Sequence, residues 1–144
     1  MTERYCEGER FADLSFTEET FEDCDFTDCV FVDCTFAKCE LYHTTLNECS
    51  LKYNTFTEMN FNRFNFSDGN EIVGSMFAKC EMQLANFKGV ELHETEFYQC
   101  DLRKADFRDA TGYKVDILGS RLKDARFSLP EAVSLLADLK IKLS

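Results

Sequence analysis

Large apolar residues recur every five residues along nearly the whole chain. Every fifth position of residues 11–66 is Phe or Leu, which gives twelve consecutive matches. After one extra residue near 68–69 the series resumes over 72–127, through Ile117, with Gly112 as its one small member. A period of five matches neither the 3.6 residues of an α-helix nor the 2.0 of a flat strand. The sequence therefore predicts a repeat protein built from five-residue units.

A second constraint lies two places before each large residue. Seven of the eight cysteines occupy this slot, four of them in "CDFTDCVFVDCTFAKC" (24–39), and most of its other members are Ala, Val, Ser or Thr, with Leu14 and Glu19 at its start. A slot shared by these types is selected for small size and burial, where free Cys behaves as a small hydrophobe. Acids crowd the position two after the large residue. The pattern indicates two inward and three outward positions per unit.

This arrangement resembles the pentapeptide-repeat family, whose unit is small residue, Asp or Asn, Leu or Phe, polar, any. The stretches that carry the resemblance are "CDFTD" (24–28), "ANFKG" (85–89), "CDLRK" (100–104) and "ADFRD" (105–109). The resemblance covers roughly residues 9–129. It implies an all-β solenoid, a right-handed quadrilateral β-helix of about six coils with four sides per coil. We expect residues 1–129 to form this β-helix and residues 130–144 a C-terminal helix and tail.

In that fold the cysteines point inward from successive sides. Zinc sites use tight pairs such as C-x₂-C, whereas a corner and a large side chain separate each cysteine here. We therefore predict packing residues and no metal site, with a soft-metal or redox role as the alternative. Cys29 lies one coil from Cys49, and Cys80 from Cys100. Their parallel Cβ vectors are poorly aimed for a disulfide.

Charge separates the chain into two halves. Residues 1–68 hold 15 acids and 5 bases, and residues 69–144 hold 12 acids and 11 bases, within a formal net charge of −11. Such a charge argues against binding nucleic acid or an anionic membrane. The first residues are polar, and no stretch approaches the ~20 apolar residues of a membrane span. We expect a cytoplasmic protein with reduced thiols.

The acids are expected to form columns on one side of the β-helix. The candidate partner-binding acidic column comprises Asp25, Asp28, Glu48, Asp68, Asp106 and Asp109. The first three coils carry about −10 over ~14 Å, a linear density like the one charge per ~1.7 Å of duplex DNA. The alternative is an acidic surface kept for solubility and to prevent edge pairing.

Catalytic signals are weak. The two histidines, His43 and His93, fall in outward slots on different sides, and no nucleophile motif or Gly-rich phosphate loop is found. We therefore predict a protein that is not an enzyme, with no catalytic residues and no cofactor.

The tail "SLPEAVSLLADLKIKL" (128–143) breaks the period of five. Ser128 and Glu131 form a capping-box pattern, and Pro130 is tolerated in a first helical turn. The candidate dimer interface is the apolar set Val133, Leu136, Leu139 and Ile141. We expect this helix to cap the open end of the solenoid and also to pair two copies in a homodimer through the C-terminal segment; the alternative is a helix that only caps.

Two functions remain open. One is a structural or scaffolding module that binds a protein partner not named by the sequence. The other follows from the family resemblance, since some pentapeptide-repeat proteins are acidic rods that bind type II topoisomerases. It implies a DNA mimic that binds DNA gyrase or topoisomerase IV and modulates fluoroquinolone sensitivity. This chain is shorter than the resistance proteins, and its one-residue insertion is too small to be their projecting loops.

Overall fold

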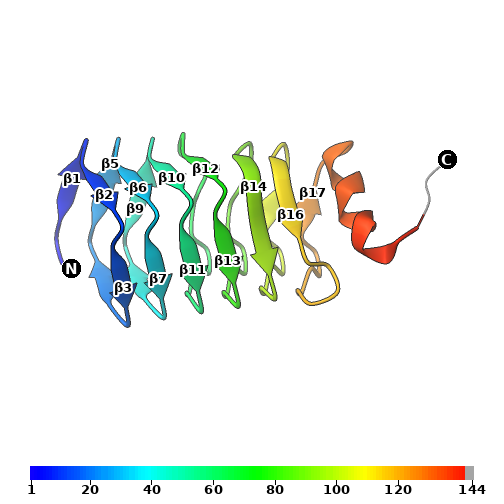
Figure 1. Ribbon diagram of the computed structural model, residues 1–144, viewed down its shortest axis with the longest axis horizontal. Coiled ribbons are helices and arrows are strands. Elements are labelled where there is room, and N and C mark those ends of the chain that lie inside the picture. Colours follow the sequence, from blue (N-terminus) through cyan, green and yellow to red (C-terminus); the bar gives the residue numbers. More distant parts are fainter. Residues whose placement is uncertain (142–144) are drawn as a thin grey trace.

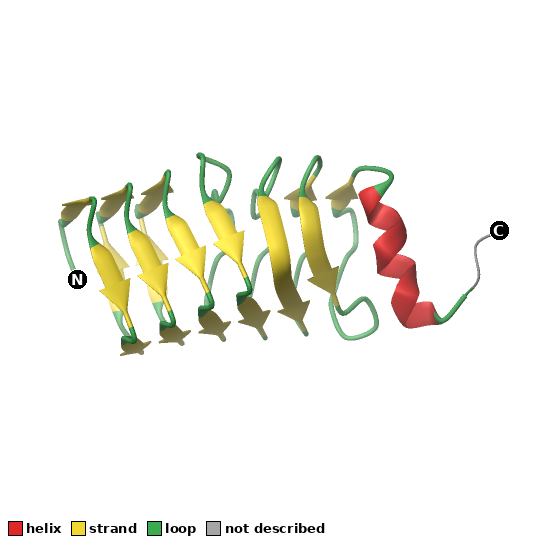
Figure 2. Cartoon of the chain, turned by 45° about the horizontal axis from the view of Figure 1, so that its top comes forward, coloured by secondary structure: helices red, strands yellow, loops and turns green. Residues whose placement is uncertain are grey.

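The chain folds into a four-sided β-helix of about six coils, followed by a short helix (Figure 1). The structure is a computed structural model; it describes residues 1–141, and at 137 and 138 only the backbone. Parallel strands stack along the rod with the N-terminus at one end and helix η1 at the other (Figure 2). The solenoid predicted from the sequence is confirmed.

We name the four sides A to D by the strands that stack on each. Side A holds β1 (Tyr5–Glu7), β5 (Asp25–Thr27), β9 (Thr45–Asn47), β15 (Asp106–Phe107) and β17 (Arg126–Phe127). Side B holds β2 (Arg10–Ala12), β6 (Val30–Val32), β10 (Ser50–Lys52), β12 (Glu71–Val73) and the start of β14 (Glu91–Tyr98). Side C holds β3 (Ser15–Thr17), β7 (Thr35–Ala37), β11 (Thr55–Thr57), β13 (Met76–Ala78), the end of β14, and the end of β16 (Thr111–Val115). Side D holds β4 (Thr20–Glu22) and β8 (Glu40–Tyr42), continued by bridges through residues 60, 81, 101 and 121.

The register between coils shows how the extra residue is absorbed. Phe31 pairs with Leu51, twenty residues on, whereas Leu51 pairs with Ile72, twenty-one residues on. The shift begins beside Gly69, whose amide donates to the carbonyl of Ser67. The insertion expected near 68–69 is therefore confined to one corner, and the central side chains stay aligned on either side of it.

The series fails once, in the last complete coil. Val115 pairs with Phe97 and takes the central place that the spacing assigned to Ile117, while Tyr113 pairs with Thr95. Phe97 and Val115 are eighteen residues apart, two fewer than the regular twenty. The turn at 116–120 contains the two remaining residues, so the register is regular again where Asp101 pairs with Arg121. The expectation for Ile117 was wrong because the register shifts between Glu91 and Thr95, where Gly112, with a φ of 76°, passes close against the backbone of His93.

The core is built from columns of stacked aromatic rings. On side C, Phe16, Phe36, Phe56, Phe77 and Phe97 stack with centroid separations of 4.9, 5.1, 4.7 and 5.0 Å. On side A, Phe66, Phe87, Phe107 and Phe127 do the same at 4.4, 5.0 and 5.0 Å. Rings on adjacent sides meet edge to face, as for Phe87 and Phe97. Both are favoured geometries for aromatic pairs.

The corners are made by residues in the left-handed region. Asp13, Asp23 and Asp33 have φ of 57°, 54° and 55°, and their outward positions match the acids expected two places after each large residue. The conformation costs a non-glycine residue roughly 1–2 kcal/mol. At each corner the amide donates to the next coil, as Asp13 N–H does to the Val32 carbonyl at 3.1 Å. The ladder of hydrogen bonds thus continues around the bend.

Helix η1 (Glu131–Leu139) is a 3₁₀ helix that covers the last coil (Figure 2). Its first turn includes the bond from Ala132 N–H to the Ser128 carbonyl. Leu135 packs against the core. Among the described residues, no helix combines the length and the apolar content needed to cross a bilayer.

Candidate partner-binding surface

The corner between sides A and B holds the first part of the expected acidic column. Asp28 and Glu48 lie in register on successive coils, because strands β5 and β9 pair twenty residues apart. Both have left-handed φ, 53° and 52°, so their carboxylates project outward.

Asp68 departs from the expected stack. The Cβ that Gly69 lacks would lie 3.1 Å from Cγ of Glu48, which puts Gly69 next in the column. Asp68 is the residue before it, and its carbonyl accepts the Glu48 amide at 2.8 Å. Its carboxylate accepts a hydrogen bond from the Asn65 side chain at 3.1 Å. Asp68 is exposed close to Glu48 but one step off the column.

The second part of the column lies two coils further on. Gly89 donates its amide to the Arg108 carbonyl, so Asp109 continues the corner beyond the two glycines. Asp109 accepts a 3.5 Å bond from the Ser128 hydroxyl. The predicted column is therefore divided into an N-terminal group and a separate group near the C-terminal end.

Asp25 and Asp106 share side A but differ in environment. Asp25 is exposed and accepts a hydrogen bond from the Thr45 hydroxyl one coil away. Asp106 is bonded by the Arg108 guanidinium, with an Nη2–Oδ2 distance of 2.8 Å. This hydrogen bonding holds the pKa of Asp106 below its usual range, against the opposing effect of burial. Asp106 is thus a neutralised carboxylate.

Asp101 and Arg103 repeat the same contact on side D at 2.6 Å. In a strand, residues i and i+2 point to the same face, so "DLR" and "DFR" each place a base beside an acid. Hydrogen bonding from Arg103 lowers the pKa of Asp101. Sequence reasoning missed both pairs, although the i, i+2 spacing was visible.

The inward slots carry hydrogen-bond donors as well as small side chains. The Cys34 thiol lies 3.5 Å from both the Phe11 and Val32 carbonyl oxygens, and the other six slot cysteines repeat this geometry. Asn54 occupies the same slot, and its side-chain amide donates a hydrogen bond to the Phe31 carbonyl at 2.9 Å. The slot therefore supplies a donor to the central carbonyl of the preceding coil.

All eight cysteines are buried and unbridged, which confirms the predicted burial of the seven in the small slot. A hydrogen bond with Cys100, together with burial, raises the pKa of the Cys80 thiol. Within the described residues, no three His, Cys, Asp or Glu side chains are grouped so as to hold a metal ion. His43 and His93 are exposed beside Asp23 and Glu91, at 3.6 and 3.4 Å.

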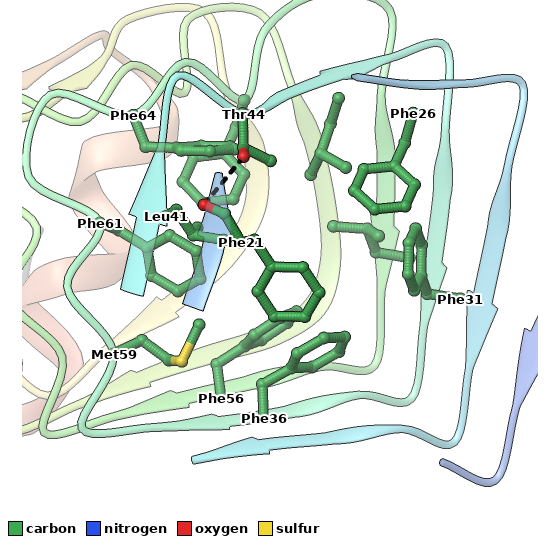
Figure 3. A pocket seen from close by; sticks show the side chains of 13 residues that line it. Phe21, Phe26, Phe31, Phe36, Leu41, Thr44, Phe56, Met59, Phe61 and Phe64 are labelled. Carbon is green, nitrogen blue, oxygen red and sulfur yellow. Dashed lines mark hydrogen bonds between the residues drawn. The ribbon is translucent and has the colours of Figure 1, made fainter. Parts of the chain in front are cut away.

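An apolar cavity of about 50 Å³ lies inside the N-terminal half (Figure 3). It forms where Leu41, Leu46 and Leu51 replace the rings of the adjacent coils. The lining residues are Phe21, Phe26, Phe31, Phe36, Leu41, Thr44, Leu46, Leu51, Phe56, Met59, Phe61, Phe64 and Phe66. The Thr44 hydroxyl donates to the Phe21 carbonyl, so this polar group is satisfied (Figure 3).

The residues expected at a dimer interface lie at the opposite end of the rod. Val133, Leu139 and Ile141 are 43%, 45% and 52% exposed, and Leu136 is half-buried. The apolar stripe is therefore wider than the contact that Leu135 makes with the core.

Comparisons with known proteins agree with this architecture. The model of pentapeptide repeats matches eight copies, over residues 10–52, 29–68, 73–103 and 91–128. No curated protein matches the sequence.

Among solved structures, a trypsin-treated R167E form of QnrB1, a plasmid-mediated fluoroquinolone resistance protein, is 14% identical with a TM-score of 0.39, covering 97% of this chain and 99% of that one. The pentapeptide-repeat protein Rfr23 from the cyanobacterium Cyanothece is 17% identical with a TM-score of 0.28, covering 88% and 89%. HetL from Nostoc, involved in heterocyst differentiation regulation, is 12% identical with a TM-score of 0.30, covering 87% of each chain. At these values the likenesses say nothing of what this chain binds.

Proposed function

Because the chain belongs to the pentapeptide-repeat family, whose function lies in side chains displayed on a scaffold, we propose that it is a non-enzymatic interaction module. Its first three coils bind a basic surface on a partner protein. The observation that carries this proposal is the excess of 15 acids over 5 bases in residues 1–68.

The local geometry supports an electrostatic contact. Acids occupy successive corners at Asp13, Glu18, Asp23, Asp28 and Asp33, all with left-handed φ. Because these corners belong to different sides of the coil, the negative potential surrounds this end of the rod. Within the predicted site we assign the contact to Asp25, Asp28, Glu48 and Asp68, and leave out Asp106, which Arg108 neutralises.

A more specific form of this proposal is DNA mimicry. An excess of ten acids over three coils of ~4.8 Å each has the linear charge density of duplex DNA. The partner chemistry that fits is a basic groove that normally holds DNA, as in DNA gyrase or topoisomerase IV. We expect the module to compete with DNA there and to alter fluoroquinolone sensitivity.

The test is gyrase supercoiling and topoisomerase IV decatenation with the chain added, with and without a fluoroquinolone. We expect inhibition or drug protection that weakens as salt rises, since exposed charges are screened beyond ~10 Å at 0.1 M salt. Reversing Asp28, Glu48 and Asp68 to Lys should abolish the effect. The matched control reverses Glu71, Glu91 and Glu94, three acids of the C-terminal half.

If wild type neither inhibits nor protects at tens of micromolar, the topoisomerase proposal fails. The broader module is tested by isothermal titration with a partner captured from the source cell. It fails if that binding is insensitive to salt and to the triple reversal at Asp28, Glu48 and Asp68.

We also propose that two copies pair through η1. Apolar patches left exposed on a capping element mark interfaces, and two-fold pairing is the commonest oligomer. At 300 mM salt, sedimentation should give a dimer of the 16.7 kDa chain, and Leu139→Glu should return it to the monomer at that salt concentration. A wild type that is monomeric at every concentration up to 100 micromolar would leave η1 with its capping role alone.

A further inference from the structure

Sides A and D, with the corner between them, form one continuous surface whose charge changes sign along the rod. We call this surface the A–D face. Over the first three coils it carries the acids Glu3, Glu7, Glu22, Asp23, Asp25 and Glu40, with Arg4 and Arg63 as the basic side chains. Over the later coils it carries the bases Lys88, Arg103, Lys104, Arg108, Arg121, Lys123 and Arg126, with the acids Glu81, Asp101, Asp106 and Asp124.

The net charges of the two ends of the face are therefore about −4 and +3. The registers place these residues on it directly: Glu40, residues 60 and 81, Asp101 and Arg121 follow one another along side D. Asp106 and Arg126 follow one another along side A. Seven of the chain's sixteen bases lie on the later part of this face.

The opposite face shows no such reversal. On sides B and C of the later coils, the acids Glu71, Glu91, Glu94, Glu96 and Asp116 outnumber Lys114 and corner Lys79. The near-neutral total of the C-terminal half therefore conceals one basic face and one acidic face.

A surface that reverses sign about its midpoint is complementary to itself. A two-fold axis perpendicular to the rod places coils one to three of one copy against coils four to six of the other. Such an isologous contact uses the same patch on both copies and forms every pairing twice. A nucleic acid does not fit as well, because its phosphates would lie against the six acids at the N-terminal end of the same face.

We propose that the A–D face binds a second copy of this chain, antiparallel and side by side. Corner residues position the contact, since Asp23 and Lys104 both project from left-handed positions of the corner between sides A and D. A surface hollow lined by Leu84, Lys104 and Arg126, together with Asn86, Asp106 and Asp124, receives acidic side chains of the partner copy. This contact is polar and separate from the apolar η1 stripe at the rod end.

The test uses the full chain with Leu139→Glu in every variant, so that η1 pairing does not contribute. In this background, sedimentation velocity at 20 mM salt should show a dimer. Its dissociation constant should rise at least tenfold at 300 mM salt, because exposed charges drive the contact. A chain that is monomeric at 100 micromolar in 20 mM salt overturns the proposal.

Two charge-reversed variants then identify the face. One carries Lys104→Glu, Arg121→Glu and Lys123→Glu, which makes the A–D face acidic throughout. The other carries Glu22→Lys, Asp23→Lys and Glu40→Lys, which makes it basic throughout.

Each variant alone should be monomeric, and an equimolar mixture should form a heterodimer with a dissociation constant within about threefold of the parent. A mixture that stays monomeric refutes the antiparallel pairing. The control Glu71→Lys, Glu91→Lys, Glu94→Lys reverses three acids on sides B and C and should leave the parent dimer intact. Circular dichroism of each variant confirms that the β-helix is retained.

Discussion

Filling the cavity with Leu46→Phe should stabilise the protein. Leu46 lies in register with Phe26 on side A and lines the 50 Å³ cavity. At about 24 cal/mol per Å³ of cavity, complete filling is worth roughly 1.2 kcal/mol, and a stacked ring pair adds about 0.5–1.5 kcal/mol. Strain from imperfect fit offsets part of this. We expect a net gain of about 1 kcal/mol, or roughly 3 °C in Tm for a chain of this length.

The measurement is urea unfolding followed by circular dichroism, with Leu102→Phe as the matched control. Leu102 lies in the later coils, where Leu92, Leu102 and Phe107 have 0% exposure, whereas the cavity-lining Phe21 and Phe36 have 4% and 7%. The same enlargement there overpacks the core and should cost about 1–3 kcal/mol. If Leu46→Phe destabilises the protein as much as Leu102→Phe does, the space at Leu46 does not accept a ring and the reasoning fails.

Two further substitutions test the hydrogen bonding inside the rod. Cys34→Ala should lower the free energy of unfolding by on the order of 1 kcal/mol. Cys34→Ser should lower it by less, because a hydroxyl still donates to the Phe11 carbonyl. Bound stoichiometric metal that is lost with Cys34→Ala would contradict the packing role of Cys34. Tyr113→Phe should raise the unfolding free energy by about 1 kcal/mol, since among the described residues the buried Tyr113 hydroxyl has no hydrogen-bond partner. Burial, and then Glu131, raise the pKa of Tyr113. Unfolded Tyr113 therefore ionises at a lower pH than folded Tyr113. The free energy of unfolding is unaffected by this difference below the unfolded pKa of about 10 and falls as pH rises further. Tyr113→Phe should flatten this alkaline decline in thermal melts.

The fold was predictable because one spacing determines both the inward and the outward residues. The five-residue period, together with the four sides that the family resemblance implies, placed Phe36, Phe56 and Phe77 in one column, and the small slot placed the cysteines inside. Their role as donors could not be read from size alone, because Ala and Cys share the slot. Val115 could not be predicted at the centre, since the register shift opposite Gly112 depends on contacts between coils.

The candidate surface was harder to predict. Counting acids gave the correct sign for the first three coils, but a one-residue insertion moved Asp68 out of the column. The neutralisation of Asp106 needed the i, i+2 geometry of a strand. The reversal along the A–D face required knowing which bases share a side, and a total charge for each half contains no such information.

The insertion at Gly69 has a consequence for how such a chain changes length. Since register is restored within one corner, a disturbance in one coil does not propagate to the next, and each coil contacts only its neighbours. A tandem duplication of twenty residues would therefore add one coil and leave the ends of the rod unaltered. The distance between the acidic end and η1 would grow in steps of ~4.8 Å, so each duplicated coil would lengthen the rod by one fixed increment.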